Sequence, residues 1–206
     1  MQRLTPELKQ QIQANLAGFE RRALAAPDHR QAAVGVVVLD DELGRACFVL
    51  TRRPGSLRRH AGQFALPGGR LEPGETPEAA AVRETEEEVG LHLEPSAVLG
   101  RLDDFATRSQ HLITPLVVWA GQDAALEPSP DEVEAVYRVP LTDLERPGNP
   151  SISQIPHSDR PLISFSLVGT TVFAPTAAIL FQFREVALHG RPTRVAHFEQ
   201  PLFAWR

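Results

Sequence analysis

The apolar residues at the start of the chain change their spacing from a helical to a strand pattern. Within residues 6–26 they recur at the three- and four-residue intervals of an amphipathic helix. These positions are Leu8, Ile12, Leu16 and Phe19. Thr5 suits an N-cap and Pro6 a first helical position, so we expect the helix to begin there. Residues 32–39 and 46–51 are apolar runs separated by an acidic turn, which predicts two paired strands.

The rest of the chain alternates predicted strands with two further helices. The predicted strand segments are 97–103, 112–119, 133–139, 163–168 and 171–173, with one short strand near Phe64. Helical spacing indicates helices at 77–89 and 176–189. Residues 52–75 and 147–161 are rich in glycine or proline, and we expect long surface loops there, the second mobile. Strands mixed with helices in this way favour an α/β or α+β sandwich.

Composition and charge narrow the class of protein. Apolar residues make up 42% and charged residues 23% of the 206 residues, which excludes a disordered chain of high charge. No run approaches the roughly 18 apolar residues of a transmembrane helix, and residues 1–26 do not resemble a secretory signal. Cys47 is the single cysteine, which excludes an intrachain disulfide and fits a cytoplasmic protein. The formal net charge of −5 argues against general nucleic-acid binding.

The helix between Thr76 and Gly90 carries an unusual group of acidic residues. At about 100° per residue, Glu84, Glu87 and Glu88 fall on one side of it. Their repulsion, near the end of the helix where the dipole disfavours negative charge, lowers stability. One interpretation is a solvated acidic face. The other is a site for Mg²⁺ or Mn²⁺, which prefer oxygen ligands.

The spacing of this segment resembles the Nudix box. The matching positions are Gly69, Glu75, Arg83, Glu84, Glu87, Glu88 and Gly90. Thr85 departs from the pattern, because the family usually has a bulky aliphatic residue there. The resemblance implies a Nudix-type α/β/α sandwich with a mixed β-sheet. It also implies an enzyme that cleaves diphosphates attached to another moiety, with Mg²⁺ or Mn²⁺ as cofactor.

The resemblance also implies a role for each matching residue. The implied metal ligands are Glu84, Glu87, Glu88 and the backbone carbonyl of Gly69. Arg83 belongs to the catalytic group and, with Glu75, orients the loop and the helix, while Gly90 ends the helix. A carboxylate takes a proton from the attacking water, and Glu87 is one candidate for this general base. Glu132, outside the box at a predicted loop–strand junction, is the other candidate, and a solvated loop glutamate is the alternative interpretation of it.

Four arginines and a histidine lie within residues 52–60, directly before the box. Arginine recognises phosphate through its planar fork, although an arginine-rich surface loop is the simpler interpretation. The segment resembles the motif of the coenzyme A diphosphatase branch of the Nudix family. The matching residues are Leu50, Thr51, Arg53, Arg58, Gly62, Pro67, Gly68 and Gly69, and the departures are Val49, Pro54 and Leu66. The candidate substrate-binding residues are Arg53 and Arg58 of the motif, with Arg59 and His60 beside them. An ordinary loop histidine is the alternative interpretation of His60.

These motifs predict a metal-dependent diphosphatase that hydrolyses coenzyme A or acyl-coenzyme A to 3′,5′-ADP and (acyl-)4′-phosphopantetheine. The alternatives are the same chemistry on ADP-ribose or a nucleoside triphosphate, and a nucleotide sensor that has lost catalysis. The intact carboxylates disfavour the sensor. The charge distribution fits a diphosphatase, because residues 69–94 carry −6 while residues 52–60 carry +4. The expected partner is a small nucleotide, with no nucleic acid and no membrane, and the resemblance leaves a homodimer open.

We expect three regions in the chain. Residues 1–30 form an N-terminal helical extension, residues 31–190 the Nudix domain, and residues 191–206 a C-terminal tail packed on that domain. Two further side chains receive structural interpretations. His111, which could line the pocket, is assigned a structural role, and Phe173 is expected in the core or against the tail.

Overall fold

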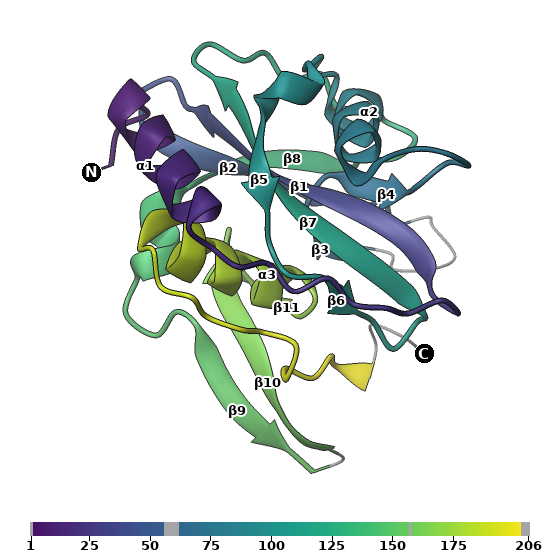
Figure 1. Cartoon of the computed structure of the whole chain (residues 1–206). Coiled ribbons are helices and arrows are strands. Elements are labelled where there is room, and N and C mark those ends of the chain that lie inside the picture. Colours follow the sequence, from purple (N-terminus) through teal and green to yellow (C-terminus); the bar gives the residue numbers. More distant parts are fainter. Residues whose placement is uncertain (1, 56–61, 157, 203–206) are drawn as a thin grey trace.

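A mixed β-sheet forms the centre of the protein in the computed structural model, which describes residues 2–55, 62–156 and 158–202 (Figure 1). Its central strand β1 (Arg30–Asp40) runs parallel to β7 (His111–Gly121) and antiparallel to β2 (Ala46–Arg52). The shorter strands are β3 (Phe64–Ala65), β4 (Gly68–Arg70), β5 (Val98–Arg101), β6 (Phe105–Ala106) and β8 (Ala135–Pro140). The order is β3-β2-β1-β7-β5, with β4 on β1, β6 on β7 and β8 on β2.

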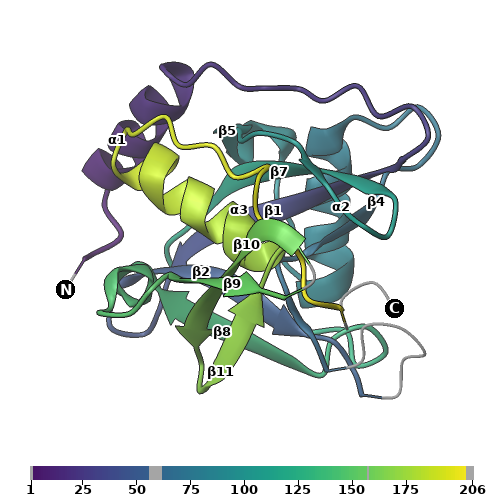
Figure 2. The same cartoon turned by 90° about the horizontal axis from the view of Figure 1, so that it is seen from below.

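Helices cover both faces of this sheet (Figure 2). α2 (Pro77–Val89) packs on one face, where Ala80, Ala81 and Val89 join a buried cluster with sheet residues. α1 (Pro6–Ala17) and α3 (Thr176–Gln182) lie on the other face, and α3 continues as the π-helical turn η3 (Phe183–Leu188). The predicted α/β/α sandwich is therefore confirmed. Two short 3₁₀ turns, η1 (Pro95–Ala97) and η2 (Leu141–Glu145), complete the helical elements.

A second sheet of three strands contains the strands predicted at 163–168 and 171–173 and extends into the surface loop predicted at 147–161. β9 (Ser151–Ile155), β10 (Ser158–Leu167) and β11 (Thr170–Phe173) are antiparallel, in the order β11-β10-β9. The loop prediction was wrong because the prolines lie where a sheet tolerates them. Pro161, for example, falls where the β9–β10 register shifts between Ser158 and Leu162.

The N-terminal helix begins as predicted but is shorter. Thr5 caps it by accepting a hydrogen bond from the Leu8 amide at 3.3 Å, and the helix ends at Ala17 instead of residue 26. The following segment is held by distant acidic side chains. The Arg22 amide donates to Asp103 at 2.7 Å and the Leu24 amide donates to Asp104 at 2.9 Å. These long-range contacts satisfy backbone donors outside a helix, so the helical spacing does not extend further.

Helix α2 has the predicted boundaries. The Thr76 hydroxyl accepts from the Ala79 amide at 3.2 Å, and Gly90 adopts the left-handed conformation with φ 67°. Thr85, the departure from the family pattern, is fully buried on this helix. Its hydroxyl donates to the Ala81 carbonyl at 2.6 Å, so the polar group is satisfied inside the apolar layer.

The described part of the C-terminal tail follows the body of the protein. Val195 and Phe198 are buried, and Glu199 forms a bridge to Leu162 of β10. The Arg194 guanidinium contacts both oxygens of Asp103, at 2.8 and 3.0 Å, which ties the tail to the loop beside β5. The tail thereby reaches the pocket described next.

Candidate active site

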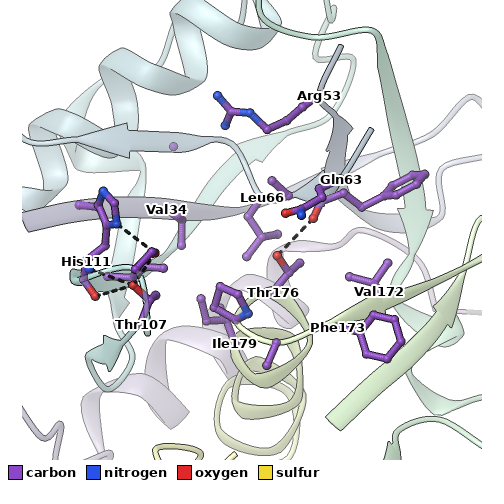
Figure 3. A pocket seen from close by; sticks show the side chains of 18 of the residues that line it. Val34, Arg53, Gln63, Leu66, Thr107, His111, Val172, Phe173, Thr176 and Ile179 are labelled. Atoms are coloured by element: carbon purple, nitrogen blue, oxygen red, sulfur yellow. Dashed lines mark hydrogen bonds between the residues drawn. The ribbon is translucent and has the colours of Figure 1, made fainter. Parts of the chain in front are cut away.

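A pocket of about 860 Å³ lies between the main sheet with α2 and the β11–α3 region (Figure 3). Its lining combines three kinds of side chain. The acidic ones are Glu84, Glu88 and Glu132, and the basic ones are Arg30, Arg53, Arg70 and His111. The apolar ones include Val34, Leu66, Val172, Phe173 and Ile179. A pocket of this size and mixed lining is typical of a small-molecule site.

The acidic wall comes from α2. Glu88 is only 5% exposed, and this burial raises the pKa of its carboxyl to about 7 while the attraction of Arg53 opposes the shift. Burial also raises the pKa of Glu84, against the pull of Arg83. Both carboxylates are therefore desolvated groups that a cation in the pocket would stabilise.

Two glycines bring backbone against these carboxylates. The Gly68 amide donates to Glu88 Oε2 at 3.3 Å. A Cβ atom at Gly69 would overlap the Glu84 carboxylate, and one at Gly68 would overlap the backbone of β1. Only glycine allows β4 to approach both α2 and β1 so closely.

Arg83 connects the loop before α2 with the acidic side chains on it. Its guanidinium donates to Glu75 through Nε at 2.9 Å and through Nη2 at 3.1 Å. Nη1 donates to both Glu84 and Glu87 at 2.9 Å, and Nη2 also donates to the Arg70 carbonyl at 3.0 Å. Arg83 thus fixes the positions of these carboxylates, the arrangement expected of an orienting residue.

The oxygen donors of this wall suit a hard divalent cation. Within residues 2–55, 62–156 and 158–202, no three acidic or histidine side chains already converge at ligand spacing. Glu87 contributes less directly than expected, because its side chain is 49% exposed and it is absent from the pocket lining. The half-buried Glu84 and the buried Glu88, which repel each other, still provide the charge and the oxygen atoms that Mg²⁺ or Mn²⁺ requires.

Glu132 reaches the pocket from a loop that is tied to the end of α2. The Ser129 amide donates to the Glu88 carbonyl at 3.0 Å, and the Glu132 amide donates to the Ser129 carbonyl at 3.1 Å. Repulsion from Glu132 contributes to the raised pKa of both Glu84 and Glu88, so its carboxylate lies near theirs.

Of the predicted substrate-binding residues, Arg53 lies in the pocket, while Arg58, Arg59 and His60 lie outside the described residues. Arg53 stands where the chain leaves β2. Its amide donates to the Gln63 carbonyl at 3.0 Å, and its carbonyl accepts from the Gly62 amide at 3.1 Å. These two bonds bring the ends of the arginine-rich segment together beside the acidic wall.

Several residues of the pocket were not predicted from the sequence as binding residues. His111 and Phe173 were assigned structural and core roles, but both line the pocket. Arg30 and Gln200 were not singled out. Arg30 lies in the pocket because the start of β1 pairs with β7 at His111, and Gln200 lies there because the C-terminal tail reaches the pocket. Both positions depend on tertiary contacts, which the sequence alone does not show.

Comparison with known proteins agrees with the geometry. The family model of the NUDIX domain matches residues 29–158, more than half of the chain. The chain belongs to the Nudix family. Nudix hydrolase 3 of Caenorhabditis elegans is 33% identical over 146 residues, covering 67% of this chain and 61% of that protein. The uncharacterized Nudix hydrolase NudL of Cronobacter sakazakii is 40% identical, covering 59% of this chain and 62% of that protein.

One further relative of this Nudix protein has a named substrate. The peroxisomal coenzyme A diphosphatase NUDT7 of Mus musculus is 34% identical over 121 residues, covering 58% of this chain and 51% of that protein. The matched part spans about half to three-fifths of the length of these curated relatives.

A solved structure supports the fold alone. A MutT/nudix family protein from Enterococcus faecalis superposes with a TM-score of 0.52 at 16% identity, covering 80% of this chain and 65% of that chain. Among the described residues, no helix has the length and apolar character needed to cross a membrane. The division of the chain at residues 30 and 190 stays a prediction.

Proposed function

We propose that the protein is a metal-dependent diphosphatase that hydrolyses coenzyme A or acyl-coenzyme A to 3′,5′-ADP and (acyl-)4′-phosphopantetheine. The observation that carries this proposal is one pocket that holds the desolvated carboxylates of Glu84 and Glu88 beside Arg53. Carboxylates alone would repel an anionic diphosphate. Carboxylates that bind a divalent cation would attract it, and the adjacent arginine would bind further phosphate oxygens.

The proposed metal ligands are Glu84, Glu87, Glu88 and the Gly69 carbonyl. Mg²⁺ or Mn²⁺ bound there would supply charge for the phosphate oxygens and acidify a bound water. Arg83 holds two of these carboxylates in place through its hydrogen bonds.

For the general base we favour Glu132 over Glu87. Glu132 lines the pocket, whereas Glu87 points to Arg83 and is half exposed. The Glu132 carboxylate would accept the proton of the attacking water at one of its oxygens. Both residues stay open to the same mutational test, described in the Discussion.

Coenzyme A as substrate is supported by the motif before the box and by one relative. The arginine-rich segment matches the coenzyme A diphosphatase branch at Arg53 and Arg58, and the Mus musculus relative carries that activity in its name. The pocket also offers an apolar wall from β11 and α3, next to Phe173 and Ile179, that suits the uncharged part of such a substrate. ADP-ribose or a nucleoside triphosphate is the competing substrate class.

The proposed setting is the cytoplasm, with a small nucleotide as the partner. The single cysteine, Cys47, is buried, and burial raises the pKa of its thiol to about 12, so it is inert and fits a reducing compartment. A homodimer stays a prediction, which gel filtration with light scattering tests.

A substrate panel tests the proposed function. Purified protein is incubated with coenzyme A, acetyl-coenzyme A, ADP-ribose and ATP, each with Mg²⁺ and with Mn²⁺, and kcat/KM is measured for each pair. We expect coenzyme A or its acetyl thioester to exceed the other two by at least about tenfold. A preference for ADP-ribose or ATP, or no hydrolysis of any of the four by folded protein, would overturn the proposal.

A further inference from the structure

A basic group of side chains lies in the pocket on three neighbouring strands. β1 pairs with β4 on one side and with β7 on the other. Arg70 of β4 stands next to Ala32 of β1, and Arg30 of β1 stands next to His111 of β7. We call Arg30, Arg70 and His111 the three-strand basic group.

The alternation of the strands explains why this group faces the pocket. Arg30, Ala32 and Val34 of β1 all line it, whereas Ala33 belongs to the buried cluster under α2 on the opposite face. On β7, His111 and Ile113 line the pocket by the same period of two. Residues two apart or on adjacent strands are neighbours on one face, so the basic side chains can act on one ligand.

The two arginines of this group make no stabilising side-chain hydrogen bond or ion pair within the part of the chain that the structure describes. Both arginines are exposed. Two guanidinium groups placed as diagonal neighbours repel each other, which lowers stability. This contrasts with Arg83 and Arg101, whose guanidinium groups pair with carboxylates.

Hydroxyl groups surround the histidine of this group. His111 Nδ1 lies 3.2 Å from Ser109 Oγ, and Ser109 Oγ lies 3.1 Å from Thr107 Oγ1. Both hydroxyl residues also line the pocket, and Thr107 is labelled there in Figure 3. Arginines with serine and threonine hydroxyls are the side chains that bind a phosphate dianion, because they supply several donors and positive charge.

We propose that the three-strand basic group binds a phosphomonoester of the substrate, separate from the diphosphate that is cleaved. The proposal rests on the proposed function, in which coenzyme A carries a 3′-phosphate as well as its diphosphate. Arg53 acts on the diphosphate, because it lines the pocket together with Glu84 and Glu88 of the acidic wall. Arg30 and Arg70 then hold the 3′-phosphate of the nucleotide, and Ser109 donates to one of its oxygens.

A binding experiment tests this subsite without requiring turnover. Calorimetry with 3′,5′-ADP and with 5′-AMP measures how much the 3′-phosphate adds to affinity in the wild type, in the double variant R30Q/R70Q, and in R22Q. Arg22 is an exposed arginine away from the pocket lining, so R22Q is the matched control. We expect the wild type and R22Q to bind 3′,5′-ADP at least about tenfold more tightly than 5′-AMP. For R30Q/R70Q we expect this difference in affinity to be less than about twofold.

Two results would overturn the subsite. One is a wild type that binds both nucleotides equally, and the other is a double variant that keeps the preference of the wild type. Kinetics give a second readout, since R30Q/R70Q should raise KM for coenzyme A about tenfold but leave KM for 3′-dephospho-coenzyme A unchanged. An equal rise for both substrates also contradicts the assignment. Failure of the wild type to cleave coenzyme A would instead count against the proposed function, and the binding result would still decide the subsite.

Discussion

Replacing Glu88 by glutamine separates the stability of the fold from the chemistry of the site. The Glu88 carboxylate is 5% exposed, and burial raises its pKa from 4.5 to about 7. A raised carboxyl pKa destabilises the folded protein by about 1.4 kcal/mol per pKa unit. This destabilisation is absent below pH 4.5, where the carboxyl is protonated in both states, and is complete above pH 7. Allowing for the burial of the amide itself, Glu88→Gln should stabilise the metal-free protein by about 2 kcal/mol at pH 8.

The same substitution should nearly abolish turnover. A neutral amide is a poor ligand for Mg²⁺, so we expect kcat to fall at least about 100-fold. The assays are thermal unfolding in EDTA at pH 8, where a rise in Tm of about 5 °C is expected, and coenzyme A hydrolysis with Mn²⁺. Glu86→Gln is the control, because the Glu86 side chain is 52% exposed on the same helix and should change stability by less than about 0.5 kcal/mol. Activity within threefold of the wild type, or a Tm lowered in EDTA, would refute the reasoning.

Four further outcomes follow from named contacts. Glu132→Gln should lower kcat about 100-fold with KM almost unchanged in steady-state kinetics. If Glu87→Gln lowers kcat by that amount and Glu132→Gln does not, Glu87 is the general base. Arg83→Gln should lower kcat about 10- to 100-fold, measured in the same assay, because it frees the carboxylates it now orients. EDTA should stop turnover, and added Mn²⁺ should restore it and raise Tm by mass action. The Arg108 guanidinium lowers the pKa of Glu199 to about 2, so its stabilising effect is complete above pH 4.5 and is lost as the pH falls toward 2. Glu199→Gln should therefore cost about 2 kcal/mol at pH 7 and flatten urea-measured stability across pH 5 to 2, whereas an unchanged pH slope would contradict this.

The sequence predicted correctly those helix boundaries that depend on hydrogen bonds and backbone conformation within a few residues. The boundaries of α2 follow from the Thr76 cap and the left-handed Gly90, and both act within a few residues. The N-terminal helix was predicted too long because the segment after its Gly18 cap is held by Asp103 and Asp104, about 80 residues away. The prolines of residues 147–161 indicated a loop, yet Pro147, Pro150 and Pro156 lie outside β9 and β10, and Pro161 falls at the register shift in their pairing.

The candidate site divides in the same way. The acidic wall could be predicted because Glu84 and Glu88 share one helix with fixed spacing. The opposing walls of the pocket could not be predicted, because they form only through tertiary contacts. These contacts place β11 and Gln200 of the tail at the pocket and pair Arg30 with His111. The resemblance to the Nudix box therefore indicated the chemistry, while the remaining lining needed the structure.

Hydrolysis of the diphosphate of coenzyme A at the acidic wall is tested by identifying the products formed from coenzyme A. Wild-type protein and Glu88→Gln are each incubated with coenzyme A and Mn²⁺, and the products are identified by mass spectrometry. We expect 3′,5′-ADP and 4′-phosphopantetheine in equal amounts from the wild type and almost none from the variant. Intact coenzyme A after incubation with folded wild-type protein, or equal product from both proteins, would contradict it.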